Sequence, residues 1–79
     1  MYATKDDIRS WFEAGKLKGA THMLIVCDDL VNEHYPIYVM PNEKITQIKK
    51  YYNTALMQSV DDVYIISQNV DKQIFKKMK

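Results

Sequence analysis

The side chains best suited to chemistry are concentrated between residues 22 and 34. Two imidazoles, one thiol and three carboxylates occur there: His22, Cys27, Asp28, Asp29, Glu33 and His34. Imidazole and carboxylate groups ligate zinc or manganese, so a metal site would pair His34 with Asp28 or Glu33. The spacing matches no specific metal pattern, and on a strand His22 and Cys27 face opposite ways because their separation is odd. We therefore expect no metal site and no cofactor.

Nucleophilic and acid–base catalysis are not indicated either. Cys27 ends an apolar run, where a free cysteine usually behaves as a small hydrophobe. The chain has only two glycines and no Gly-rich phosphate loop. The acid pairs Asp28-Asp29 and Asp61-Asp62 are suited to proton transfer, but nothing in the sequence marks a cleft around them. We therefore predict that the protein is not an enzyme.

Size and composition predict one small globular domain, residues 1–79. With 79 residues and 47% hydrophobic side chains, the core is close to the lower limit for folding alone. We expect such a chain to associate with itself. A formal net charge of +1 gives no strong field toward nucleic acid or membrane.

The compartment indicated is a reducing cytoplasm. Cys27 is the only cysteine, so an internal disulfide is excluded. The charges at Lys5-Asp6-Asp7 argue against a signal peptide. The apolar run from Met23 to Cys27 is too short to span a bilayer, so no membrane partner is expected.

The N-terminal third predicts a helix followed by a buried strand. Thr4 and Asp7 form a capping box, a helical face follows, and Gly19 ends the helix. Gly15 on that face allows a neighbouring element to approach closely. Residues 21–27 form a strand that is apolar on both sides, which must therefore be covered on both. One cover is the helix layer, and the other is the C-terminal helix or another subunit.

The rest of the chain predicts a second strand, a helix, a third strand and a last helix. The second strand covers residues 35–40, and Pro36 places it at or near a sheet edge. Asn42 caps the next helix, which ends at Asn53. The third strand spans residues 56–66, where Asp61-Asp62 introduces a bulge or a turn. Ser67 or Asn69 caps the last helix. The order α-β-β-α-β-α favours an α+β fold, with helices packed on a three-stranded, mainly antiparallel sheet.

Tyrosine is the residue type that most suggests a contact surface. There are six tyrosines, which combine large contact area with a polar tip and stack on nucleobases. We expect Tyr52 and either Tyr35 or Tyr38 in the core, and Tyr51 and Tyr64 on a contact surface. Arg9 adds phosphate pairing. The candidate ligand-binding residues are Arg9, His22, Tyr38, Lys50, Tyr51 and Tyr64.

Part of the sequence resembles a known group of proteins. Residues 7–39 carry the pattern Asp7-Ile8-x-x-Trp11-Phe12-x-x-Gly15-x-x-x-Gly19-Ala20-Thr21-His22-Met23-x-Ile25-Val26-Cys27-Asp28, then Tyr35-Pro36-Ile37-Tyr38-Val39. This pattern resembles small uncharacterised proteins encoded by bacteriophages and prophages, and the likeness continues loosely to Val63-Tyr64. The resemblance implies a phage accessory protein of the host bacterial cytoplasm. Such proteins commonly act by blocking host defence proteins or by sequestering nucleotide immune signals inside an oligomer.

Three functional hypotheses follow. The first is a non-enzymatic, self-associating binding protein that antagonises a host defence system. It would either capture a small anionic nucleotide at a subunit boundary or block a host protein through a surface patch. The second is a nucleic-acid-binding accessory protein that uses Lys49-Lys50-Tyr51-Tyr52 and the lysine-rich tail. The third is a small metal-dependent hydrolase that uses the cluster at residues 22–34.

Overall fold

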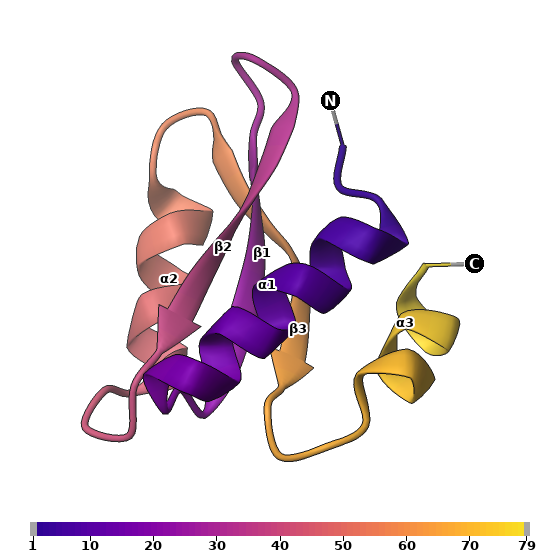
Figure 1. The fold of residues 1–79 in the computed structure, drawn as a ribbon. Helices are drawn as coiled ribbons and strands as arrows, with labels where there is room; N and C mark the ends of the chain where they lie inside the picture. Colours follow the sequence, from indigo (N-terminus) through magenta and orange to yellow (C-terminus); the bar gives the residue numbers. More distant parts are fainter. Residues whose placement is uncertain (1, 79) are drawn as a thin grey trace.

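Three helices and three strands make up the fold, as a computed structural model that describes residues 2–78 shows (Figure 1). In chain order they are α1 (Lys5–Lys18), β1 (His22–Asp28), β2 (Glu33–Val39), α2 (Ile45–Thr54), β3 (Gln58–Ile65) and α3 (Val70–Lys77). The predicted α+β class and the order α-β-β-α-β-α are confirmed. Within residues 2–78 there is no helix of the length and apolarity needed to cross a membrane.

The sheet is antiparallel throughout, with strand order β2-β1-β3. The first apolar strand is therefore the central one. The Thr21 carbonyl accepts from the Ile66 N–H, just after β3, and the Asp29 N–H donates to the Met57 carbonyl, just before it; the Thr21 N–H donates to the Val39 carbonyl of β2. With this alternation, the main chain of the odd-numbered residues of β1 faces β3 and that of the even-numbered ones faces β2. Pro36 lies opposite Ile25, an odd-numbered residue. Its missing N–H thus points to the outer edge of the sheet, as the sequence led us to expect.

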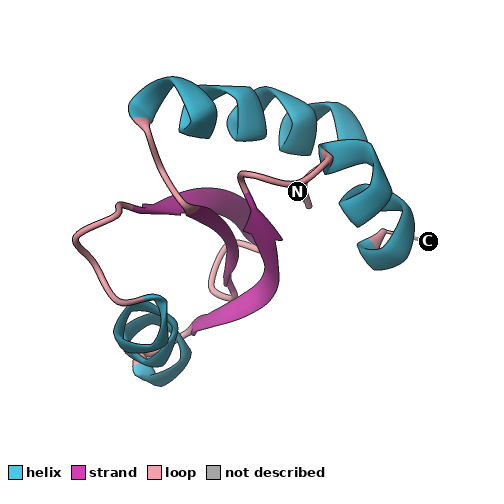
Figure 2. Ribbon diagram, turned by 90° about the horizontal axis from the view of Figure 1, so that it is seen from below, coloured by secondary structure: helices cyan, strands magenta, loops and turns pink. Residues whose placement is uncertain are grey.

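Both faces of β1 are covered by helices of the same chain. Figure 2 shows α1 and α3 on one side of the sheet and α2 on the other. Met23 and Ile25 pack with Phe12 of α1 and Ile74 of α3, whereas Leu24 and Val26 pack toward α2. Residues 23–27 are each at most 3% exposed. The second cover was expected to be the C-terminal helix or another subunit; both alternatives are wrong, because α2 covers that face and α3 lies on the same face as α1.

The first helix is fixed at both ends by the predicted signals. The Thr4 side chain accepts from the Asp7 N–H, and the Asp7 carboxylate accepts from the Thr4 N–H, which completes the capping box. Gly19 ends α1 in the left-handed region, at φ 78°. Gly15 lies against the Tyr38 ring, and the Tyr38 hydroxyl donates to the Trp11 carbonyl at 2.7 Å. Tyr38 thereby fastens α1 to the edge strand β2.

Side-chain amides close the outer edge of β3. Ile65 donates its N–H to Gln73 Oε1 at 2.7 Å, and Gln73 Nε2 donates to the Ile65 carbonyl at 3.0 Å. Gln73 thus acts like one peptide unit of a further strand. At the other end of β3, the Val60 N–H donates to Asn53 Oδ1 at 2.9 Å. These bonds engage the outward main-chain groups near both ends of β3 and leave fewer of them to pair with another chain.

The irregularity at Asp61-Asp62, predicted as either a bulge or a turn, is a β-bulge. The pairing of β1 with β3 shifts by one residue between Ile25 and Val26, because Ile25 lies opposite Asp62 and Val26 opposite Val60. Asp61 is therefore the extra residue of β3. A bulge breaks the period-2 alternation of side chains, so consecutive residues share one face of the sheet.

Two predicted helix ends are wrong in detail. Lys44, not Asn42, is the N-cap of α2. Residues 41–43 form a turn instead, and the Glu43 carboxylate accepts from the Met40 N–H at 2.9 Å. Asn53 lies inside α2, one residue before its end at Thr54, and the C-cap is Ala55 in an extended conformation. The last helix is capped by Asn69, which accepts from the Lys72 N–H as predicted.

We predict that Gly15→Ala destabilises the protein by about 1–3 kcal/mol. A Cβ at residue 15 would lie 2.9 Å from the Tyr38 ring and 3.1 Å from Ile66 Cδ1. Helix propensity alone would stabilise the variant by about 1 kcal/mol. Urea unfolding followed by circular dichroism measures the difference. A gain in stability would show that the ring moves aside at no cost.

We also predict that Gln73→Glu lowers the free energy of unfolding by about 1–3 kcal/mol. The substitution keeps the shape but turns the donor to the Ile65 carbonyl into a carboxylate oxygen. Gln68→Glu is the control, since it makes the same charge change at an exposed side chain. Equal urea midpoints for the two variants would contradict the role given to Gln73.

Candidate functional site

A thiol, an imidazole and a carboxylate meet on the α1/α3 face of the sheet. They belong to Cys27 of β1, His34 of β2 and Asp61 of β3, and their ligand atoms all lie within 4.8 Å of one another. We call these three residues the strand cluster. The sequence pointed to Cys27 and His34 separately but did not connect them with Asp61, which is 27 residues from His34.

The register of the strands explains why these side chains meet. Cys27 lies directly opposite His34. Because Cys27 bonds β3 rather than β2, this is a non-hydrogen-bonded pair, in which side chains lie closest. The bulge then turns Asp61 and Asp62 to the same face. His22, at the far end of β1, faces the opposite side and takes no part, as its odd separation from Cys27 predicted.

His34 is held at both ring nitrogens. The Ala3 N–H donates to Nδ1 at 3.0 Å, and Nε2 lies 2.7 Å from Asp61 Oδ2. Since Nδ1 accepts, the ring proton is on Nε2 and is donated to Asp61. The Tyr2 ring lies against the imidazole, with centroids 4.9 Å apart. The imidazole therefore joins the N-terminal segment to the bulge.

The geometry of the strand cluster does not make Cys27 a nucleophile with His34 as its general base. Cys27 is buried, and burial raises the pKa of its thiol; the carboxylates of Asp29 and Asp61 raise that pKa further. Both nitrogens of His34 are occupied by other partners, so neither is free to take the thiol proton. The thiol stays protonated at neutral pH, which gives no support to cysteine catalysis.

A hollow of about 360 Å³ lies beside the strand cluster, between the N-terminal segment and the end of α3. Ile8, Ile25 and Met78 form its apolar wall, and Asp62 and Lys77 supply opposite charges. Burial raises the pKa of the Asp62 carboxyl; nearby Lys77 lowers it, and Asp61 raises it again. This hollow is amphipathic, with one carboxylate and one ammonium group.

Two of the predicted ligand-binding residues have structural partners on the α1/α3 side. Arg9 pairs with Asp71 at 2.7 Å and with Asp6 at 3.0 Å, and the hydrogen bond to Asp71 raises the pKa of its guanidinium. Tyr38 is engaged by α1, as described above. Arg9 thus joins α1 to α3, and Tyr38 joins α1 to β2.

The expected place of Tyr64 on a contact surface is wrong. Tyr64 is fully buried on the sheet beneath the helices. Burial raises its pKa to about 12, and the charge of Asp62 adds to the effect. Its hydroxyl has no hydrogen-bond partner in the described part of the chain.

Lys50 and Tyr51 lie on the opposite side of the sheet, on α2. Both are exposed, and the Tyr51 ring makes an edge contact with Tyr52. Tyr51 also lines a hollow of about 390 Å³ between α2 and β2, to which Tyr38 contributes. The charged residue in that lining is Glu43, and no cationic side chain of residues 2–78 takes part. The six predicted ligand-binding residues are therefore not brought together in one site.

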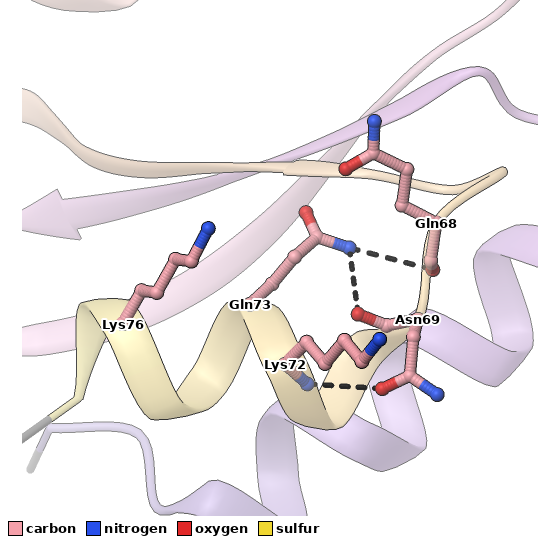
Figure 3. A pocket seen from close by; sticks show the side chains of 5 residues that line it. All are labelled: Gln68, Asn69, Lys72, Gln73 and Lys76. Atoms are coloured by element: carbon pink, nitrogen blue, oxygen red, sulfur yellow. Dashed lines mark hydrogen bonds between the residues drawn. The ribbon is translucent and has the colours of Figure 1, made fainter.

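A third hollow, at the start of α3, is explained by the fold itself. Figure 3 shows Gln73, Asn69 and Gln68 around it, with Lys72 and Lys76 on the helix. Gln73 Nε2 donates to the main-chain carbonyls of Gln68 and Asn69, while the Asn69 side chain caps α3. These polar groups are engaged in holding α3 against β3.

Exposed apolar side chains that the sequence did not predict as a site lie on two loops at one end of the sheet. They come from the turn between β1 and β2 and from the α2–β3 loop: Leu30, Val31, Leu56 and Met57. We call them the end patch. The two loops are joined because the Asp29 N–H donates to the Met57 carbonyl at 2.8 Å. The signal was present as apolar residues in both loops, but the contact between the loops depends on strand register.

No family model, curated protein or solved structure matches this chain.

We predict that Tyr64→Phe preserves the fold and leaves the free energy of unfolding unchanged or raises it by about 1 kcal/mol. The variant removes a buried hydroxyl that has no partner and keeps the ring. Thermal and urea unfolding measure the change. A loss of more than about 1 kcal/mol would mean that the hydroxyl has a stabilising partner.

Proposed function

We propose that the protein is a non-enzymatic binding protein that acts by docking on another protein through the end patch. The observation that carries this proposal is the exposure of large apolar side chains on two loops that a main-chain hydrogen bond holds together. Leu56 is 90% exposed and Leu30 is 73% exposed. Large exposed apolar side chains on two adjoining loops are typical of an interaction site.

The backbone of both loops supports a fixed presentation of these side chains. Asn32 and Met57 adopt left-handed conformations, at φ 53° and φ 62°. Asparagine adopts this conformation readily, whereas for methionine it is uncommon and persists where the surrounding structure determines it. Here the ends of β1 and β3 and the hydrogen bond between Asp29 and Met57 supply that surrounding structure.

The charges around the end patch favour a basic partner surface. Asp28 and Asp29 follow β1, and Glu33 begins β2 directly opposite Asp28. This acidic rim would steer a partner that carries an apolar recess edged with lysine or arginine. The resemblance described from the sequence suggests the biological setting: a phage-encoded antagonist of a host defence protein, in the host cytoplasm.

The other binding modes have less support. Nucleotide capture would need a cationic group beside the tyrosines. Tyr38 and Tyr51 share a hollow whose charged residue is Glu43, and Arg9 lies on α1, across the sheet from α2, and is paired with Asp6 and Asp71 (Figure 2). Nucleic-acid binding would need one basic surface. Lys49 and Lys50 are on α2, whereas the lysines at residues 72, 76 and 77 are on α3, across the sheet. Self-association stays a prediction.

Photocrosslinking followed by an affinity measurement tests the proposal. A photoreactive amino acid at position 56 is expected to capture a protein partner in bacterial cells, and the same probe at position 17 is the control. Leu17 and Leu56 are both 90% exposed, but Leu17 lies on α1, away from the end patch. With the purified partner, Leu56→Asp should weaken binding at least about tenfold, because a buried leucine contributes about 1.5–3 kcal/mol. Leu17→Asp should leave binding unchanged.

Two results would contradict the proposal. One is equal weakening by both substitutions. The other is the absence of a crosslink at position 56 together with a thermal stabilisation by cyclic or ADP-ribose-type nucleotides, since a ligand that binds only the folded state raises the melting temperature. That outcome would favour nucleotide capture.

A further inference from the structure

We propose that the strand cluster binds a divalent transition metal ion, and that Zn²⁺ fits it best. The donors are the Cys27 thiolate, the His34 imidazole and the Asp61 carboxylate, whose ligand atoms lie within 4.8 Å of one another. Sulfur, nitrogen and oxygen donors together are typical of zinc and unlike the all-oxygen sets that hold magnesium or calcium. This inference is independent of the docking surface proposed above.

The sheet holds the three donor side chains close together before a metal ion binds. Each of the three strands supplies one ligand, and strand pairing fixes the Cys27–His34 contact. The bulge supplies the third ligand, because Asp61 is the extra residue and shares a face with Cys27. Three protein donors leave the fourth position of tetrahedral zinc for a water molecule.

Metal binding at His34 changes its proton arrangement. In the structure the ring proton is on Nε2, between His34 and Asp61, and Nδ1 accepts from the Ala3 N–H. A metal ion bound at Nε2 takes the place of that proton, which moves to Nδ1 so that the imidazole stays neutral. The thiol proton of Cys27 leaves to solvent.

Because of this tautomer change, metal binding at His34 and the hydrogen bond from Ala3 to His34 exclude each other. Once Nδ1 carries a proton, it faces the Ala3 N–H as a second donor, and their 3.0 Å hydrogen bond is lost. The Tyr2 ring, which lies against the imidazole, loses its position with it. We therefore expect metal binding to release residues 2 and 3 from His34.

Cobalt and zinc titrations test this proposal. Co²⁺ should bind at one ion per chain and give a near-ultraviolet sulfur-to-metal band, which Cys27→Ser should abolish. Asp61→Asn can still accept the Nε2 proton, so it should fold and yet bind Zn²⁺ about 10- to 100-fold more weakly. His22→Gln, at the other histidine of the chain, should bind as the unmodified protein does.

Nuclear magnetic resonance provides a second readout of the same event. Without metal, the ¹⁵N signals of His34 should report a proton on Nε2. With one equivalent of Zn²⁺, the proton should be on Nδ1, and the Ala3 amide should move to a random-coil position. Cobalt binding without a sulfur band, equal zinc affinity in Asp61→Asn and the unmodified protein, or an Ala3 amide unchanged at zinc saturation would each overturn the proposal.

Discussion

The structure depends on the need to bury β1 on both faces. Five consecutive residues of this strand, 23–27, are apolar, and a strand alternates its side chains between two faces. No single helix layer can cover such a strand. The chain answers with α1 and α3 on one side and α2 on the other, and with β2 and β3 along the two edges. The other elements of the fold therefore either pair with the central strand or cover one of its faces.

A single local irregularity then turns a covered sheet into a sheet with a polar site. The bulge at Asp61 and Asp62 brings two carboxylates to the α1/α3 face, where regular alternation would bring one. One of them meets His34 and Cys27, and the other lines the hollow beside Lys77. The N-terminal segment closes over this place through Ala3 and Tyr2. Polar groups at a bulge in an otherwise apolar sheet are what makes this face distinctive.

The sequence predicted the elements well because their signals are local. The capping box at Thr4, the left-handed Gly19, the Asn69 cap and the doubly apolar strand all depend on neighbouring residues. The role of Asn53 is not local: its side chain accepts from the N–H of Val60, a residue of the next strand. Likewise Gln73, which closes the edge of β3, looked like any polar residue on a helix.

The candidate site was less predictable because it depends on register. Cys27 and His34 are recognisable from their residue types. Asp61 joins them only through the bulge, and the sequence does not determine toward which face of the sheet the bulge turns the Asp61 side chain. Tyr64 was placed on a contact surface from its residue type, and the alternation after the bulge buries it. The end patch is not evident from the sequence, because Leu30 and Leu56 are 26 residues apart. Amide hydrogen exchange across a hundredfold dilution tests most directly whether one chain buries its own central strand. The account predicts that the amides of residues 23–27 exchange slowest and at rates independent of concentration; faster exchange of these amides on dilution would show that a second subunit covers the sheet.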